Sequence, residues 1–159
     1  MTRVGLGIDL HPLVAGRPLV LGGVTVPSEL GLDGHSDADV LTHAVCEGLL
    51  GALALGDLGR HFPDTDPRYR HIASLALLDE VKALVVGRGA RIVNVDATVL
   101  AQSPRLAPFI PEMAKRLADA LGLDSSRVSV KAKSPEQLGS LGRRDGIAAL
   151  AVVCLEVAE

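Results

Sequence analysis

The chain is poor in aromatic residues: its 159 residues include no Trp, one Tyr and two Phe. Bases could stack on few of its side chains, and a net charge of −3 without a basic run offers little to neutralise a nucleic-acid backbone. The composition therefore argues against non-specific nucleic-acid binding. Any phosphate that the protein binds is expected to be small, and the core must be built from Val, Leu, Ile and Ala.

Long apolar runs and cysteine pairs are also missing. No stretch approaches the roughly 20 apolar residues of a membrane span, and the N-terminus carries no signal pattern, so we expect a soluble, cytoplasmic protein. Cys46 and Cys154 lie in apolar stretches and form no CxxC pair, which predicts small buried side chains in a reducing compartment. The length favours a single domain over residues 1–159.

Hydrophobic periodicity predicts an alternation of strands and helices. Strands are expected over 3–13, 18–26 with a break at Gly22-Gly23, 91–100, 128–133 and 147–157, and helices over 36–55, 72–86 and 111–121. Ser36 is the expected N-cap of the first helix, with Asp39 closing a capping box. Residues 28–35 and 56–67 are expected to be loops, because they are rich in Gly, Pro and Asp and lack periodicity.

This irregular alternation predicts an α+β fold, that is, a two-layer α/β domain with a mixed β-sheet and helices on one face. No helices remain to cover the other face of the sheet. Another copy of the chain is the natural cover, in a closed symmetric assembly.

Three side chains that can bind a metal occur in segments that otherwise look like core. Asp9 and His11 are two residues apart in a predicted strand, so they lie on one face of it. If His43 packs against that face, two imidazoles and one carboxylate form an open site of the catalytic zinc type. The alternative is structural: Asp9 and His11 face solvent at a strand end, and His43 is a hydrogen-bonded interior histidine.

Three other polar groups suit the binding of anions. His35-Ser36 precedes the first predicted helix, whose N-terminal amides favour a phosphate, although capping alone would explain Ser36. A second group offers cations for phosphates and a carboxylate for a hard divalent ion, but it also fits a solvated turn. It consists of Lys131, Lys133, Ser134 and Glu136. The segment 142–146 contains two arginines that could bind an anion or form a charged surface turn.

These residues occur in an order and at spacings that resemble the 2-C-methyl-D-erythritol 2,4-cyclodiphosphate synthase family. The matching segments cover nearly the whole chain: Gly5–His11, His35–Ala44, Leu50–Ala52, Gly56–Gly59, Phe62–Asp66, Asn94–Asp96, Ala101-Gln102, Lys131–Lys133, Leu138-Gly139 and Gly142-Arg143. One short motif could match by chance, but so many in the right order could not.

The resemblance implies two metal sites and a substrate pocket. It implies one Zn²⁺ per subunit on Asp9, His11 and His43, and a second divalent ion, Mg²⁺ or Mn²⁺, on Glu136. His35 and Ser134 match the residues that stabilise the transition state. Cytosine would be bound by Ala101, Gln102, Ser103, Pro104, Arg105, Leu106, Ala107 and Lys133, and methylerythritol by Asp57, Leu58 and Gly59 with the adjoining loop Phe62, Pro63, Asp64, Thr65 and Asp66. The remaining implied substrate contacts are Asp9, Leu10, His11, His35, Ser36, Ser134, Pro135, Glu136, Ser140 and Arg143.

The implied reaction converts 4-diphosphocytidyl-2-C-methyl-D-erythritol 2-phosphate to the cyclic diphosphate and CMP. The 2-phosphate attacks the β-phosphorus, which makes the enzyme a phosphorus–oxygen lyase of isoprenoid precursor biosynthesis. The resemblance also implies a homotrimer whose sheets pack around a three-fold axis, with active sites between subunits. A zinc-dependent hydrolase of small phosphoesters and a non-catalytic trimeric nucleotide-binding protein are the alternatives.

The chain departs from the family pattern at three positions. Lys133 stands where some members carry a hydroxyl residue, Pro135 follows Ser134, and Ser140 replaces an aromatic residue often found beside the trimer axis. Ser140 therefore puts an aromatic lining of the central cavity in doubt. Arg143 is retained, and its binding of an isoprenoid diphosphate in that cavity is a hypothesis.

Overall fold

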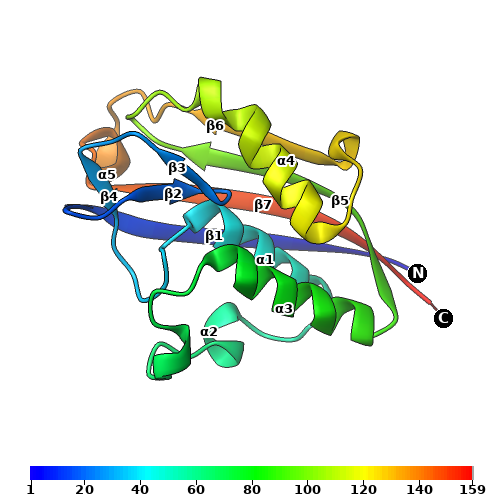
Figure 1. Cartoon of the computed structure of the whole chain (residues 1–159). Helices are drawn as coiled ribbons and strands as arrows, with labels where there is room; N and C mark the ends of the chain where they lie inside the picture. The colour runs from blue at the N-terminus through cyan, green and yellow to red at the C-terminus, as the bar shows by residue number, and fades with distance from the viewer. Residues whose placement is uncertain (159) are drawn as a thin grey trace.

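A computed structural model describes residues 1–158. Its elements, in chain order, are β1 (Thr2–Ala15), β2 (Leu19–Leu21), β3 (Val24–Val26), β4 (Leu30–Leu32), α1 (Val40–Ala52), α2 (Leu58–His61), η1 (Pro67–Tyr69), α3 (Ser74–Gly87), β5 (Ala90–Leu100), η2 (Ala107–Phe109), α4 (Ile110–Leu121), η3 (Ser125–Arg127), β6 (Val128–Lys133), α5 (Gly139–Gly142) and β7 (Gly146–Val157). Helices α1, α3 and α4 lie on one face of the sheet (Figure 1). The expected α+β fold with a mixed sheet is confirmed.

The main sheet has the strand order β4-β1-β7-β5-β6. β1 and β5 both run antiparallel to the central strand β7, while β6 runs parallel to β5. The register places Leu10 opposite Ala148, and Ala148 opposite Leu100. The segments that leave the C-terminal ends of β1, β5 and β6 therefore emerge at the same end of the sheet.

Helix α1 lies directly on β1, and two glycines make that close approach possible. A Cβ atom at Gly5 would overlap the Gly48 carbonyl oxygen, and one at Gly7 would overlap the Ala44 carbonyl oxygen. Alternation along the strand puts Asp9 and His11 on the same face as these glycines. The contact between backbones thus brings the next residues of β1 against the start of α1, which contains His43.

The two faces of the sheet differ sharply in burial. On the helix side, the odd-numbered residues of β7 from Ile147 to Leu155 are fully buried. On the other face, the even-numbered residues of β1 are exposed: Val4, Leu6, Ile8 and Leu10 are each between 55% and 65% accessible, and Val152 of β7 lies beside them. Cys46 is buried as expected, whereas Cys154 is only partly buried because it belongs to this uncovered face. Over residues 1–158 no helix is long and apolar enough to cross a membrane.

Several local expectations are wrong, among them the loop expected over 56–67, which contains the short helix α2. The first helix begins at Val40 rather than at Ser36, because Ala38 adopts a left-handed backbone with a φ of 56° and Asp39, not Ser36, is the N-cap. It ends at Ala52 rather than near Leu55, since Ala54 is again left-handed. The expected loop 28–35 contains β4, which pairs with the end of β1 and extends the sheet by one short strand.

Candidate active site

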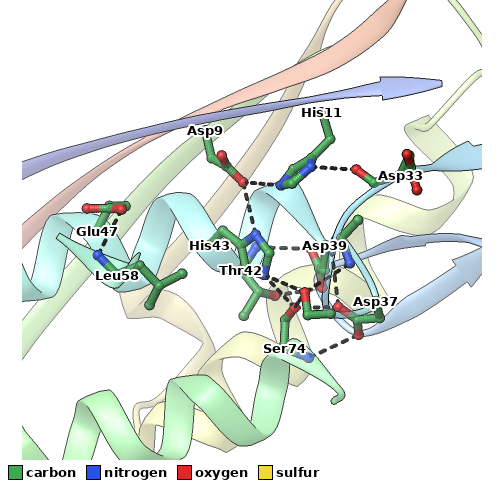
Figure 2. A network of polar contacts seen from close by, with 12 residues as sticks. Asp9, His11, Asp33, Asp37, Asp39, Thr42, His43, Glu47, Leu58 and Ser74 are labelled. Atoms are coloured by element: carbon green, nitrogen blue, oxygen red, sulfur yellow. Dashed lines mark hydrogen bonds and ion pairs between the residues drawn. The ribbon is translucent and has the colours of Figure 1, made fainter. Parts of the chain in front are cut away.

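Asp9, His11 and His43 converge at the C-terminal end of β1, although His43 lies 34 residues after Asp9 in the chain (Figure 2). Asp9 Oδ2 is 3.1 Å from His11 Nε2 and 3.0 Å from His43 Nδ1. One ligand atom from each of the three residues lies within 4.8 Å of the other two. The expected convergence on one face is therefore present, and these three residues are called the metal cluster below.

The contacts of His11 indicate which of its two ring nitrogens a metal would bind. His11 Nδ1 lies 2.7 Å from the Asp33 carbonyl oxygen, which can only accept a hydrogen bond. Nδ1 therefore carries a hydrogen, and Nε2, which donates to Asp9 in the absence of a metal, is the nitrogen that could exchange its hydrogen for a metal ion. Two imidazole nitrogens and a carboxylate oxygen with room for a fourth ligand are the donor set of an open zinc site, so the residues fit such an ion.

The electrostatics of the metal cluster also favour a cation. Burial by itself would raise the pKa of Asp9, but hydrogen bonds from His11 and His43 lower that pKa well below its usual value. The hydrogen bond with Asp9 in turn raises the pKa of His11. Asp9 is thus a charged carboxylate in a half-buried position, where a divalent cation would be attracted strongly.

Arg17 holds the segment that orients His11. Its guanidinium donates to Asp33 Oδ1 at 3.1 Å, to the Gly34 carbonyl at 2.8 Å and to the Ser36 carbonyl at 2.8 Å. One side chain therefore fixes the course of residues 33–36 beside the metal cluster. This role of Arg17 was not predicted, because nothing in its local pattern distinguishes it from a surface cation.

A pocket of about 410 Å³ opens beside the metal cluster. Its walls are Asp9, His11, Gly34, His35, Ser36, His43, Glu47, Leu58, Gly59, Phe62, Asp64, Tyr69 and Leu77. Most of the residues expected around the zinc and the methylerythritol are in this set. A larger pocket of about 580 Å³ shares Phe62 and Tyr69 with it but contains none of the metal cluster, so the smaller pocket is the candidate active site.

His35 faces this pocket and is held from the far side. Its Nε2 donates to the Asp66 carbonyl oxygen at 3.3 Å, and Asp66 itself pairs with Arg68 at 2.6 Å. His35 and Ser36 do not stand at the helix N-terminus, as the sequence suggested. They precede it by several residues, and the buried Asp39 carboxylate already accepts the hydrogen bond of the Thr42 amide there.

Some expected contacts of the substrate lie at the rim of the pocket or away from it. Asp57 caps α2 by accepting from the Arg60 amide at 2.8 Å. Leu10 is 65% accessible and points to the opposite face of the sheet. Pro63, Thr65 and Asp66 belong to the same loop as Phe62 and Asp64 but do not line the pocket.

Glu47, Tyr69 and Leu77 line the pocket and were not expected. Glu47 follows His43 by four residues on α1, a spacing that puts two side chains on one helix face and could have revealed it. Its Oε1 accepts a hydrogen bond from the Leu58 amide at 3.0 Å, and burial raises the pKa of its carboxyl. Glu47 therefore fastens the 58–64 wall of the pocket to the helix that carries His43.

The remaining expected residues form a second loop group, defined here as 101–107 and 133–136. It follows β5 and β6, and none of its members lines the 410 Å³ pocket. The Ala101 amide donates to the Lys133 carbonyl at 3.1 Å, and the Gln137 amide donates to Gln102 Oε1 at 2.9 Å. These two contacts join the loops into one unit.

The backbone of the second loop group is strained where Glu136 lies. Glu136 and Gln137 have φ values of 53° and 63°, a left-handed region that costs non-glycine residues about 1–3 kcal/mol each. Ser134 Oγ accepts from the Glu136 amide at 3.0 Å and helps to hold this turn. Five residues with expected roles are exposed: Lys133, Ser134, Glu136, Ser140 and Arg143. Arg143 pairs with Asp145 at 3.2 Å.

Residues 2–156 match the model of the YgbB family. The 2-C-methyl-D-erythritol 2,4-cyclodiphosphate synthase of Desulfitobacterium hafniense is 59% identical over 155 residues, which cover 98% of both chains. The synthase of the same name from Geobacter sulfurreducens is 56% identical over 154 residues, covering 97% of this chain and 98% of the relative.

Solved structures agree with the sequence relatives. The bifunctional IspDF of Campylobacter jejuni matches with a TM-score of 0.95 and 40% identity, covering 100% of this chain and 43% of that one. The CDP complex of IspF from Plasmodium falciparum matches with a TM-score of 0.86 and 30% identity over 99% and 97% of the two chains. A match in sequence and in fold over nearly the whole length shows that this chain belongs to the YgbB family.

Proposed function

We propose that this chain is a single cyclodiphosphate synthase domain. It converts 4-diphosphocytidyl-2-C-methyl-D-erythritol 2-phosphate to 2-C-methyl-D-erythritol 2,4-cyclodiphosphate and CMP, as a phosphorus–oxygen lyase of isoprenoid precursor biosynthesis in the cytoplasm. The observation that carries the proposal is the metal cluster, which borders a pocket in a chain that shares 59% of its residues with a synthase of that name. CDP in the structure of a relative supports a cytidine-linked substrate.

Asp9, His11 and His43 would hold one Zn²⁺, and Glu136 would be a ligand of a second divalent ion, Mg²⁺ or Mn²⁺. When bound, these ions neutralise charge on the phosphate oxygens and make the phosphorus more electrophilic. The attacking 2-phosphate is already an anion, so no side chain has to remove a proton from it. The protein's task is then to align the two ends of one substrate and to stabilise the additional negative charge.

The residues around the pocket suit this task. His35 lies in the pocket wall with its ring held by the Asp66 carbonyl, and we assign to it and to Ser134 the stabilisation of the transition state. Leu58 and Gly59 in the wall, with Asp57 and the loop 62–66 beside them, would contact the methylerythritol. The second loop group would bind cytosine through its backbone, which explains how so few aromatic residues suffice.

The site would be completed by a second subunit. The metal cluster and the second loop group emerge at the same end of the sheet, but the pocket of one chain includes only the former. The uncovered sheet face presents Val4, Leu6, Ile8 and Leu10 to solvent, and an exposed apolar patch of this kind marks a protein interface. We therefore propose a homotrimer with its active sites between neighbouring subunits.

Sedimentation equilibrium tests this assembly. The wild-type protein is expected at three times the mass of one chain, and Ile8→Lys, which puts a charge in the middle of the apolar face, is expected to sediment as a monomer. Val86→Lys is the matched control, because Val86 is 60% exposed on α3, away from the sheet. A wild-type monomer would refute the trimer.

Incubation with the diphosphocytidyl substrate and Mg²⁺, followed by ³¹P NMR, tests the reaction. Cyclic diphosphate and CMP are expected in equal amounts. CMP with an open-chain diphosphate would instead support the alternative of a zinc-dependent phosphoester hydrolase. Binding without turnover would support the non-catalytic nucleotide-binding protein.

Metal analysis of His43→Ala tests the ligand assignment. The variant is expected to lose stoichiometric zinc while it keeps the assembly state of the wild type, because His43 faces the metal cluster and not the uncovered sheet face. His61→Ala is the control: His61 bonds the Leu55 carbonyl at 3.0 Å and lies outside the metal cluster. Full zinc occupancy in His43→Ala would contradict the assignment.

A further inference from the structure

The metal cluster accounts for only one of the two ring nitrogens of His43. Nδ1 faces Asp9, while Nε2 points toward Ser74 at the start of α3 (Figure 2). There Nε2 lies 2.8 Å from Ser74 Oγ and 3.1 Å from Ser36 Oγ. Ser74 has no accessible surface, so its hydroxyl must find all its partners within the protein.

Those partners determine where each hydrogen lies. The Asp37 carboxylate, which can only accept, contacts both the Ser74 hydroxyl and, at 3.0 Å, the Ser74 amide. Ser74 Oγ–H therefore donates to Asp37, and the Ser74 oxygen is left to accept from His43 Nε2–H. The imidazole thus carries a hydrogen on Nε2, so Nδ1 can give up the hydrogen that it directs at Asp9 and offer its lone pair to a metal.

Backbone contacts fix this arrangement independently of the side chains. The Asp37 amide donates to the Ile72 carbonyl at 3.1 Å, and the His71 amide donates to the His35 carbonyl at 2.8 Å. The segment before α1 and the segment before α3 are therefore paired side by side. Asp37 also satisfies an amide at the N-terminus of α3, which has no intrahelical partner.

We propose that Ser74 and Asp37 are positioning residues of the metal site, and that they hold His43 in the Nε2–H tautomer with Nδ1 aimed at the metal. The inference rests on the zinc site proposed above. Histidine ligands of metals commonly donate their other ring N–H to a carboxylate or carbonyl, and loss of such a partner typically costs 10–100-fold in affinity. Here a serine is inserted between the imidazole and the carboxylate.

Asp9, His43 and Ser74 are connected like the nucleophilic triad of hydrolases, but the burial of Ser74 and its bond to Asp37 exclude that role. In such a triad the carboxylate bonds the imidazole, and the serine is exposed to substrate. In this chain the serine is fully buried, and its hydroxyl hydrogen goes to a second carboxylate, that of Asp37. Ser74 therefore supports His43 and cannot attack a substrate.

Zinc affinity measured by competition with a chelator tests the proposal without reference to turnover. Ser74→Ala is expected to bind zinc about 10–100-fold more weakly than wild type. Ser74→Thr, which keeps the hydroxyl, is expected to recover most of that loss. Ser36→Ala is the matched control, because it removes the longer of the two hydroxyl contacts to the same nitrogen, and its affinity is expected to change less than that of Ser74→Ala.

Long-range ¹H–¹⁵N spectra of the zinc-loaded protein supply a second readout. In the wild type the His43 Nε2 proton is expected to exchange slowly with solvent because Ser74 accepts it. In Asp37→Asn, which leaves the Ser74 hydroxyl in place should Ser74→Ala not fold, that proton is expected to exchange faster.

Two results would overturn the positioning role of Ser74 and Asp37 alone: folded Ser74→Ala with wild-type zinc affinity, or a larger loss of affinity in Ser36→Ala than in Ser74→Ala. A wild-type protein that binds no zinc would instead refute the metal site itself. The two failures are therefore distinguishable.

Discussion

The metal cluster and the second loop group differ in how completely a single chain builds them. Asp9, His11 and His43 are half-buried or buried, and the second ring nitrogen of each histidine is bonded to another part of the same chain. Lys133, Ser134 and Glu136 are exposed, and Glu136 lies on a strained backbone. The first region is ready to bind a ligand. The second has the features of a surface that another subunit and a substrate would complete.

This difference between the two regions implies that substitutions near the metal cluster should lower both the stability of the fold and ligand binding. Substitutions in the second loop group should lower ligand binding with little effect on stability.

Gly7→Ala should have the largest effect. The added Cβ would overlap the Ala44 carbonyl, so α1 must move away from β1 and take His43 with it. We expect a loss of about 3 kcal/mol or more in the free energy of unfolding, measured with urea, together with loss of bound zinc. Gly87→Ala at the end of α3 is the control, because a Cβ there meets nothing within 4 Å and alanine favours a helix. Unchanged stability and zinc binding in Gly7→Ala would refute the close-contact argument.

Asp39→Asn should have the next largest effect. The fully buried carboxylate accepts from the amides of Gly22 and Gly23 and from both the amide and the hydroxyl of Thr42. An amide side chain has one acceptor oxygen, and its NH₂ group would face donors. We expect a cost of roughly 3 kcal/mol in urea unfolding. A cost below that of an ordinary surface substitution would show that the β2–β3 turn does not depend on this anchor.

Gln102→Ala should show the opposite behaviour. It removes the acceptor for the Gln137 amide in an exposed region, so the expected loss of stability is at most about 1 kcal/mol. The affinity for CDP, measured by calorimetry, is expected to fall about fivefold, because the turn that presents Glu136 is no longer tied to the 101–107 loop. Gln137→Ala keeps the amide donor and should bind CDP like the wild type. Equal effects in the two variants would contradict the role of this contact.

The ion pair of Asp96 and Lys131 should have the smallest effect. Both side chains are about half exposed, and such pairs are worth about 0–1 kcal/mol. The hydrogen bond from Lys131 lowers the pKa of Asp96. Because that pKa is lower in the folded state, the stabilisation is present above the unfolded value of about 4 and disappears as the pH falls through the folded value. Urea unfolding of wild type and Lys131→Met should therefore differ slightly at pH 7 and less at pH 2, and a larger difference at pH 2 would refute the sign.

Local patterns predicted the elements whose stability depends on their own residues. The strand 128–133 and the turn at Gly22-Gly23 were predicted as they occur, because β-branched alternation and paired glycines act within a few residues. The start of α1 was misplaced, since Ser36 and Asp39 are both good caps. The left-handed Ala38 between them, which decides the choice, has no signature in the sequence.

Contacts between distant segments could not be predicted in the same way. β4 was not predicted because the β2–β3 hairpin separates it from its partners, Leu13 to Ala15. Ser74 was not predicted as part of the site because only the packing of α3 brings it to His43. Arg17 and Glu47 act on segments that lie 11 to 19 residues away. Their spacing in the sequence carried little information about these roles.

The sequence by itself determined that Asp9 and His11 share a face, because side chains alternate along any strand. It also determined the family, through motifs spread along most of the chain. Only the tertiary structure decided that His43 joins them, that its Nδ1 rather than its Nε2 faces Asp9, and that the second loop group stays outside the pocket. The reason is physical: strand alternation is a property of the backbone, whereas the position of a ring nitrogen depends on the packing of α1 against two glycines and on a serine from another helix.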